Sequence, residues 1–167
     1  MFQELNNPVM PTEEAVKVSE TVQPEPIKRV RKVDSLGRSY GTGRRKTSVA
    51  RVWFIKSDSG KNSFTVNGKD VDQYFTRDVY SSDIRLPLSI SLLEGEGYAI
   101  KSTVKGGGLT GQSGALRLGI SRALVNFDPS LRDALKQKGL MTRDSRKVER
   151  KKYGHLKARK STQYRRR

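Results

Sequence analysis

The chain has 167 residues, a formal net charge of +17 and an isoelectric point near 10.4. A compact protein with so much like charge repels itself, so these numbers predict a polyanionic partner. The chain has no cysteine and one histidine, which excludes disulfides and thiolate metal sites and argues against a His-built metal site or a Ser–His catalytic pair. No apolar run approaches the roughly 18 residues of a membrane-spanning helix.

The charge is unevenly distributed along the chain. Residues 1–27 carry −4, residues 28–51 carry +8, residues 52–140 carry +3 and residues 141–167 carry +10. A nearly balanced middle between basic arms indicates one small globular domain that binds something anionic. We therefore expect three parts, which are an acidic, proline-containing extension with a basic lead-in at 1–37, a globular domain at 38–140 and a basic tail at 141–167.

The first 27 residues contain four prolines and predict a disordered extension. They have neither the basic region nor the apolar region of a secretory signal. Their five glutamates are also wrong for an intact mitochondrial transit peptide, whereas a presequence already removed would leave no trace.

A glycine-rich cationic segment, Gly37–Lys46, is predicted to be a loop. Its end superficially resembles a nucleotide-binding P-loop, but it lacks the Gly-Lys-Ser/Thr order and precedes a strand rather than a helix. The pattern therefore argues against nucleotide hydrolysis and favours the clamping of phosphates by Arg44, Arg45 and Lys46. The alternative is a solvated basic loop.

The following two segments are predicted to pair as a β-hairpin. Ser48–Lys56 is rich in β-branched and aromatic residues, as strands are, and Asn62–Val66 returns beside it after the turn residues at 57–60. Asn67-Gly68 is expected to close the hairpin. Trp53 and Phe54 are expected in the core or at its edge.

The middle of the domain gives weaker signals. Asp70 is expected to cap a short helix that runs through Phe75. The apolar stretch Leu86–Leu93 is interrupted by Pro87, and the pattern does not decide its state. Glu94–Gly97 is predicted to be a turn.

The second half of the domain is clearer. Tyr98–Lys105 alternates as a half-buried strand does, and 111–127 carries an apolar stripe at helical spacing. Asp128-Pro129 ends that helix, and Ser130–Lys138 is expected to form a last helix that ends at Gly139. The predicted fold class is α+β, with a small mixed sheet and helices packed on one face.

Between the strand and the long helix, Gly106–Gly111 fits the spacing G-x-G-x-x-G of dinucleotide-binding turns. No acidic residue ends a second strand about 20 residues on, and the chain is too short for a doubly wound sheet with a substrate domain. Backbone amides at a helix N-terminus still attract phosphate, and here the phosphate of an RNA backbone is favoured, with Gly107 and Gly108 as the candidate RNA-binding residues.

The long helix contains small residues where alanine or leucine would be preferred, namely Gly114, Gly119 and Ser121. They indicate close approach of another backbone, which is either RNA or a neighbouring element of the protein. Arg117 and Arg122 lie off the apolar stripe and are predicted to reach phosphate. The alternative is tight helix–sheet packing with solvated arginines.

The tail holds twelve Lys or Arg residues against two acids, and it has too little apolar surface to fold alone. Arginine forms bidentate hydrogen bonds with phosphate, and tyrosine stacks on bases. This composition therefore favours an RNA-binding tail over a solvated tail or a localisation signal. The candidate RNA-binding residues of the tail are Arg143, Arg146, Lys147, Arg150, Lys151, Lys152, Tyr153, Lys157, Arg159 and Lys160.

Several of these motifs, taken in order and with their spacing, resemble one family, the universal small-subunit ribosomal protein S nine in its bacterial and organellar type. The matching stretches are YGTGRRK from Tyr40, GGGLTGQ from Gly106, SRAL from Ser121, LMTRDSRKVERKKYG from Leu140 and KAR from Lys157. The resemblance covers about residues 38–167.

The resemblance implies a structural protein with no catalytic residues, no cofactor and no metal. It implies a fold like the second domain of ribosomal protein S five, and a place in the head of the small subunit among neighbouring head proteins. Ribosomal RNA would be bound by the residues above together with Gln112. The tail would thread towards the anticodon stem-loop of peptidyl-site transfer RNA, which Arg165, Arg166 and Arg167 would contact.

Two positions depart from the family pattern, and the lead-in bears on location. Leu118 stands where bacterial members commonly carry histidine, and its place off the apolar stripe suggests contact with RNA or a partner. The end of the chain reads Gln163-Tyr164 before three arginines. Asp34 and 37–40 resemble both alphaproteobacterial and mitochondrial members. The mitochondrial matrix is the favoured location, and the bacterial cytoplasm is the close alternative. Two rivals remain, a free-standing RNA-binding protein or RNA chaperone and a nucleotide-dependent enzyme.

Overall fold

The computed structural model describes residues 30–57, 60–91 and 97–164. In chain order the elements are β1 (Ser39–Arg45), β2 (Ser48–Lys56), β3 (Ser63–Val66), β4 (Lys69–Asp70), α1 (Val71–Tyr74), α2 (Asp78–Ile90), β5 (Tyr98–Lys105), α3 (Leu109–Phe127), a short 3-10 helix (Pro129–Leu131) and α4 (Arg132–Gln137). The expected disordered extension at 1–27 and the expected turn at 94–97 lie wholly or largely outside the described residues.

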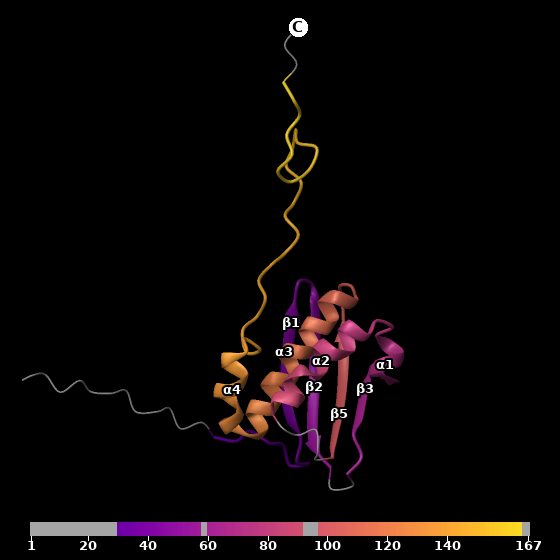
Figure 1. Cartoon of the computed structure of the whole chain (residues 1–167), viewed down its shortest axis with the longest axis vertical. Helices are drawn as coiled ribbons and strands as arrows, with labels where there is room; N and C mark the ends of the chain where they lie inside the picture. Colours follow the sequence, from indigo (N-terminus) through magenta and orange to yellow (C-terminus); the bar gives the residue numbers. More distant parts are fainter. Residues whose placement is uncertain (1–29, 58–59, 92–96, 165–167) are drawn as a thin grey trace, which may run out of the picture.

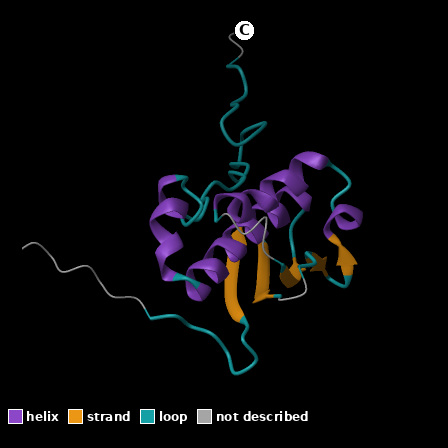
Figure 2. Ribbon diagram, turned by 60° about the horizontal axis from the view of Figure 1, so that its bottom comes forward, coloured by secondary structure: helices purple, strands orange, loops and turns teal. Residues whose placement is uncertain are grey.

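The five strands form one mixed sheet in the order β1-β2-β5-β3-β4. β5 runs antiparallel to β2 and parallel to β3, so it is the centre of the sheet. The helices gather on one side of the strands (Figures 1 and 2). The α+β prediction, with helices on one face, is therefore confirmed.

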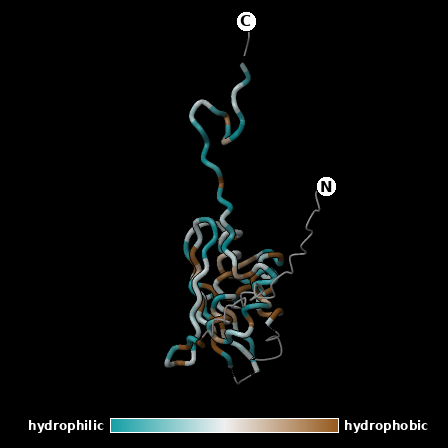
Figure 3. The backbone as a smooth tube through the Cα atoms, turned by 90° about the vertical axis from the view of Figure 1, so that its left-hand side faces the viewer, coloured by the Kyte–Doolittle hydropathy of each residue, from teal (hydrophilic) through white to brown (hydrophobic). Residues whose placement is uncertain are grey.

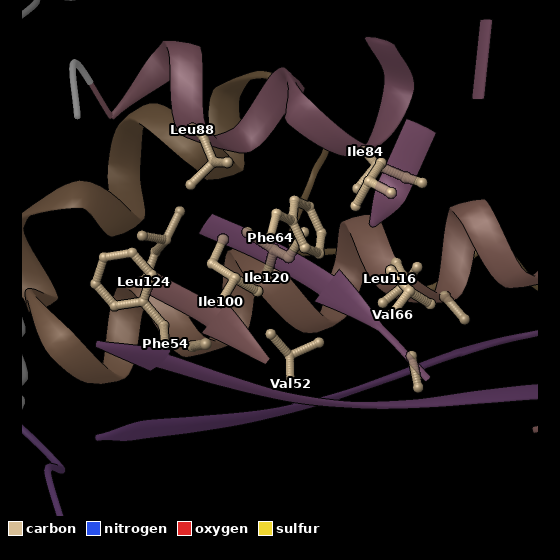
Figure 4. Packing of buried hydrophobic residues seen from close by; sticks show 14 of the residues in the cluster. Val52, Phe54, Phe64, Val66, Ile84, Leu88, Ile100, Leu116, Ile120 and Leu124 are labelled. Atoms are coloured by element: carbon tan, nitrogen blue, oxygen red, sulfur yellow. The ribbon is translucent and has the colours of Figure 1, made fainter. Parts of the chain in front are cut away.

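The core lies between the sheet and the helices α2 and α3. Side chains from β2, β5 and β3 point towards side chains of the two helices, as Figure 4 shows for Val52, Ile100 and Phe64 opposite Leu116 and Ile120. Most of these side chains are fully buried. Since burying one such side chain contributes about 1.5–3 kcal/mol, this layer holds the sheet and the helices together.

The strongest sequence patterns gave the right elements. β2 has the predicted bounds, and β5 alternates buried and exposed positions as expected. The helix α3 begins at Leu109, two residues before the predicted start, and its apolar stripe is buried. The predicted last helix is split into the 3-10 turn and α4, and Gly139, with a φ of 71°, follows its end.

The predicted hairpin of 48–56 with 62–66 is wrong. The partner of β2 is β1, so much of the segment expected to be a glycine-rich loop is an edge strand. β3 pairs instead with β5 and with the short strand β4, and Asn67-Gly68 makes the tight turn between β3 and β4. Both residues of that turn have positive φ, 51° and 82°, as a two-residue hairpin turn requires.

The glycines of β1 explain why a strand looks like a loop in the sequence. Gly41 and Gly43 face α3, and a methyl group at either would overlap backbone atoms of the helix. On the helix side, Gly119 packs against Val52 and β1, and Gly114 packs against the side chain of Arg45. The small residues of the long helix therefore admit a neighbouring element of the protein, which is one of the two explanations left open by the sequence.

α2 is a helix that the sequence did not reveal. Pro87 lies inside it and removes one backbone donor, which is why the pattern looked interrupted. The helix is held from the core side by Ile84, Pro87 and Leu88, all buried. The short helix α1 is where it was expected, but the Asp70 side chain makes no capping hydrogen bond.

Leu118 is 4% exposed. It therefore packs inside the protein, whereas its place off the apolar stripe had suggested contact with RNA or a partner. Among the described residues, no helix is long and apolar enough to cross a membrane.

Candidate nucleic-acid interface

Two connections meet at one end of the sheet. Arg45 pairs with Ser48 across the β1–β2 turn, and Val49 pairs with Lys105 at the end of β5. The turn at 46–47 therefore lies beside the loop Gly106–Gly108, and the Ser48 hydroxyl donates a 3.0 Å hydrogen bond to the Gly106 carbonyl. This end brings together exposed cations from both segments, namely Arg44, Lys46 and Lys105.

The N-terminus of α3 opens at the same place. Gly106 and Gly107 have φ values of 77° and 63°, which glycine adopts readily, and a methyl group at Gly107 would overlap the Ser48 hydroxyl. Gly108 is the N-cap residue, and no side chain caps the first turn of α3. The amides of Gly111 and Gln112 bond to the Gly108 carbonyl, which leaves those of Leu109 and Thr110 at the positive end of the helix dipole, as an anion-binding site requires.

Arg45 is a largely buried residue that links three segments at this end of the sheet. Its guanidinium donates to the Thr110 carbonyl at 3.1 Å and pairs with Asp144 at 3.1 Å, and its side chain is only 18% exposed. The Nε atom is buried without a hydrogen-bond partner. Arg45 thus connects β1, the start of α3 and the start of the tail, while its neighbours Arg44 and Lys46 remain exposed.

Asp144 anchors the beginning of the tail. It accepts hydrogen bonds from the side chain and the backbone N–H of Arg146, and it pairs with Arg45. The hydrogen bonds from Arg146 and then the nearby charges hold the pKa of Asp144 well below its usual range, and they raise the pKa of Arg146. A hollow of about 310 Å³ beside this pair is lined by Arg45, Lys46, Arg146, Lys147 and Val148.

A polar network that the sequence did not indicate supports the glycine loop. Gln112 donates to the Gly106 carbonyl at 3.2 Å and accepts from the Tyr74 hydroxyl at 2.9 Å. The Tyr80 hydroxyl lies 2.9 Å from the Thr110 hydroxyl, and this hydrogen bond, with the charge of Arg77, lowers the pKa of Tyr80. Tyr74 and Tyr80 lie in α1 and α2, and their roles could not be read from local spacing.

The tail leaves the domain beside this end and projects away from it (Figures 1 and 3). All ten tail candidates, from Arg143 to Lys160, are exposed. The segment folds back on itself once, where the Leu156 amide donates to the Lys160 carbonyl at 2.9 Å and Glu149 pairs with Arg159 at 2.9 Å. Arg150 lies over the ring of Tyr153 at 5.5 Å.

The comparison with known families agrees with this geometry. A family model described as ribosomal protein S9/S16 matches residues 43–167, which span the basic end and the whole tail. The chain belongs to the ribosomal protein S9/S16 family. It is therefore a structural protein of the small ribosomal subunit that binds ribosomal RNA, and not an enzyme.

Besides Arg45 and Gln112, two more predicted RNA contacts of this S9/S16 family member make contacts within the protein. Arg117 forms an ion pair with Asp83 of α2, and Arg122 donates to the Thr42 carbonyl of β1 at 2.8 Å. The side chain of Arg117 is 31% exposed, so the ion pair does not bury it completely. Both arginines first position α3 against its neighbours, and contact with phosphate at these two positions stays a prediction.

We expect the anchor at Asp144 to persist in mild acid. A carboxylate whose folded-state pKa is lowered contributes stability above its ordinary pKa of about 3.9, and this is lost only as the pH falls through the lowered value. Replacing Arg146 with glutamine removes the main cause, so the pKa of Asp144 should rise towards the ordinary value. A carboxyl ¹³C NMR titration measures it.

The matched control for this titration is Arg143→Gln, which removes an exposed tail arginine of the same charge. It should leave the pKa of Asp144 nearly unchanged. An equal rise in both variants would mean that net charge, rather than the hydrogen bonds from Arg146, sets the titration.

Proposed function

We propose that this protein binds ribosomal RNA in the head of the small subunit through its basic end, and that its tail continues to the transfer RNA in the peptidyl site. The single observation that carries the proposal is the tail itself. From Arg143 to Lys160 its cations are exposed on a segment that projects from the domain, and only a few of them pair with the tail's own two acids, so most of this charge is available to a partner outside the fold. The family supplies ribosomal RNA as the first partner, and neighbouring head proteins are further proposed partners.

The proposed ribosomal RNA contacts fall into two groups. The exposed group contacts phosphate directly, and it consists of Arg44, Lys46, Gly107, Gly108 and the ten tail candidates. The second group, Arg45, Gln112, Arg117 and Arg122, makes hydrogen bonds inside the protein and holds the first group in place. Phosphate contacts of this kind fix position and carry no sequence preference.

Arg165, Arg166 and Arg167 are proposed to contact the backbone of peptidyl-site transfer RNA. A guanidinium forms two parallel hydrogen bonds with a phosphate, which an ammonium does not. Deleting Tyr164–Arg167 should leave assembly intact and speed transfer RNA dissociation for all anticodons alike. Each lost charge-assisted contact is worth about 1.5–3 kcal/mol at most, and less where water screens it. The measurement is the dissociation rate from wild-type and truncated subunits.

The matched control replaces the three terminal arginines with lysines, which keeps the charge and removes the planar fork. Dissociation should then be intermediate, because electrostatic attraction remains while bidentate geometry is lost. If truncated subunits assemble normally and retain transfer RNA as wild type does, the tail ends in ribosomal RNA and the transfer RNA contact is wrong.

We also propose the mitochondrial matrix, rather than the bacterial cytoplasm, as the compartment of the ribosome. The lead-in fits this compartment, since Asp34 and 37–40 resemble mitochondrial members, but they resemble alphaproteobacterial members equally, so the bacterial cytoplasm is the close alternative that the test distinguishes. Co-sedimentation with mitochondrial small subunits after fractionation tests it. A free-standing RNA chaperone would instead stay in the unsedimented fraction.

A further inference from the structure

The face of the sheet turned away from the helices has an ordered pattern of its own. The register places Tyr40, Trp53, Lys101 and Thr65 in one row across β1, β2, β5 and β3, and Asp70 of β4 ends that row. A second row contains Thr42, Arg51 and Thr103, and a third contains Arg44, Val49 and Lys105. Alternation along the strands puts all these side chains on the face opposite the core.

The charge on this face is one-sided. Its outward positions hold four cations, Arg44, Arg51, Lys101 and Lys105, against a single acid, Asp70, at the far edge. All four cations are exposed. A strand of nucleic acid complements this distribution, whereas a protein partner would have to bring a matching acidic surface.

An aromatic pair lies at the β1–β2 side of the same face. The rings of Tyr40 and Trp53 are 5.5 Å apart between centroids, and Tyr40 is 39% exposed. Arg51 donates to the Tyr40 hydroxyl at 3.3 Å, which places a guanidinium beside the rings. Aromatic rings next to cations on a sheet surface form a platform on which unpaired bases stack while phosphates contact the cations.

A hollow of about 500 Å³ adjoins the pair. Lys32, Arg38, Tyr40, Trp53 and Asn126 are among its lining residues. The Lys32 amide bonds to the Asn126 carbonyl at 2.8 Å, and Asn126 bonds to the Tyr40 carbonyl at 2.8 Å, so the lead-in forms a fixed wall. The Nε atom of Arg38 is buried without a hydrogen-bond partner. The volume lies within the range of small-ligand sites and accommodates one nucleotide base.

We propose that this sheet face is a second RNA-binding surface, on which an unpaired nucleotide stacks against Trp53 and Tyr40 while Arg51 and Lys101 contact its flanking phosphates. The surface adjoins the glycine-loop end of the sheet, with which it shares Arg44 and Lys105, but its aromatic pair and the cations Arg51 and Lys101 lie on the open face, outside the loop and the tail. It deepens the family's binding of ribosomal RNA, and it does not depend on the proposed contact with transfer RNA.

The chain has one tryptophan, so its fluorescence reports on this face alone. Full-length protein is titrated with a short single-stranded oligouridylate that carries a fluorescent label. Label anisotropy measures binding anywhere on the protein, and tryptophan emission is recorded in parallel with unlabelled oligonucleotide. Inorganic polyphosphate, which has the charge but no bases, is the matched ligand. We expect saturable quenching by the oligonucleotide and little or none by polyphosphate.

The double variant Arg51→Gln, Lys101→Gln should raise the oligonucleotide concentration at half-quenching by about tenfold, since two phosphate contacts are lost. Lys61→Gln, an exposed lysine in the β2–β3 connection, is the control and should leave it unchanged. Circular dichroism checks that each variant folds.

Two results would overturn the proposal. If anisotropy shows that the oligonucleotide binds while tryptophan emission does not change, RNA does not bind the sheet face, and a protein neighbour would be its partner instead. Equal quenching by polyphosphate and by oligonucleotide would mean that no base stacks there. Truncating the tail after Gln163 tests the transfer RNA contact separately, so the two ideas can fail independently.

Discussion

Replacing Gly43 with alanine is expected to destabilise the domain by about 3 kcal/mol or more, a large part of the roughly 5–15 kcal/mol that holds a domain folded. A methyl group there would overlap the carbonyl oxygen of Ala115 and lie 2.5 Å from the amide nitrogen of Gly119. Both are helix backbone atoms, so no rotamer change relieves the overlap. Either β1 or α3 has to move.

The consequence extends to the basic end. β1 carries Arg44 and Arg45, and Arg45 connects α3 to the start of the tail. Displacing β1 should therefore weaken RNA binding as well as stability. Urea unfolding followed by circular dichroism gives the change in free energy, and RNA binding measured below the unfolding transition gives the second effect.

The matched control is Gly37→Ala. Gly37 has a φ of 72° and no atom within 4 Å of an added methyl group, so only backbone strain of about 1–2 kcal/mol is expected. If Gly43→Ala is no less stable than Gly37→Ala, the close packing of β1 on α3 does not hold the edge strand.

The same contact shows why one part of the fold could not be predicted. Gly41 and Gly43 are favourable in β1 because they let α3 approach, and this reason lies about 75 residues away in the sequence. Within the strand itself, two glycines and two cations are a composition typical of a loop. In the same way, Pro87 obscured α2, whose stability comes from core contacts of Ile84 and Leu88 rather than from helix propensity.

The pairing of strands was also beyond local sequence. β2 and β3 are consecutive in the chain, and a short connection between consecutive strands favours a hairpin. The central position is taken instead by β5, whose buried Ile100 and Val104 face the helices. By contrast, β2, β5 and α3 were predictable because their periodicities are set by a single buried face.

The candidate interface was predictable in composition and not in detail. Charge and glycine spacing were enough to indicate the basic end and the tail. The inward role of Arg45, however, depends on Thr110 and Asp144, which lie far from it in sequence. The bracing of the glycine loop by Tyr74 and Tyr80 likewise requires the packing of α1 and α2 beside α3.

The largest functional effect is the expected loss of RNA affinity as the salt concentration rises. If the basic end and the tail together neutralise about six to ten phosphates, affinity for isolated ribosomal RNA should fall by roughly 10³–10⁵ between 50 and 200 mM salt. The physical reason is counterion release, which contributes less as the bulk salt concentration rises. Filter binding across a salt series gives the slope of the logarithm of affinity against the logarithm of salt concentration.

Variants of the tail show which residues contribute to this salt dependence of RNA affinity. Replacing Arg150, Lys151 and Lys152 with glutamine should reduce it by about 2–3, since each lost phosphate contact removes about one. Lys61→Gln is the control, because its connection lies at the end of the sheet away from the glycine loop, as the pairing of Lys56 with Tyr98 and of Ser63 with Ala99 requires. A wild-type slope near zero, or an equal change in both variants, would show that the tail does not bind RNA through its charges.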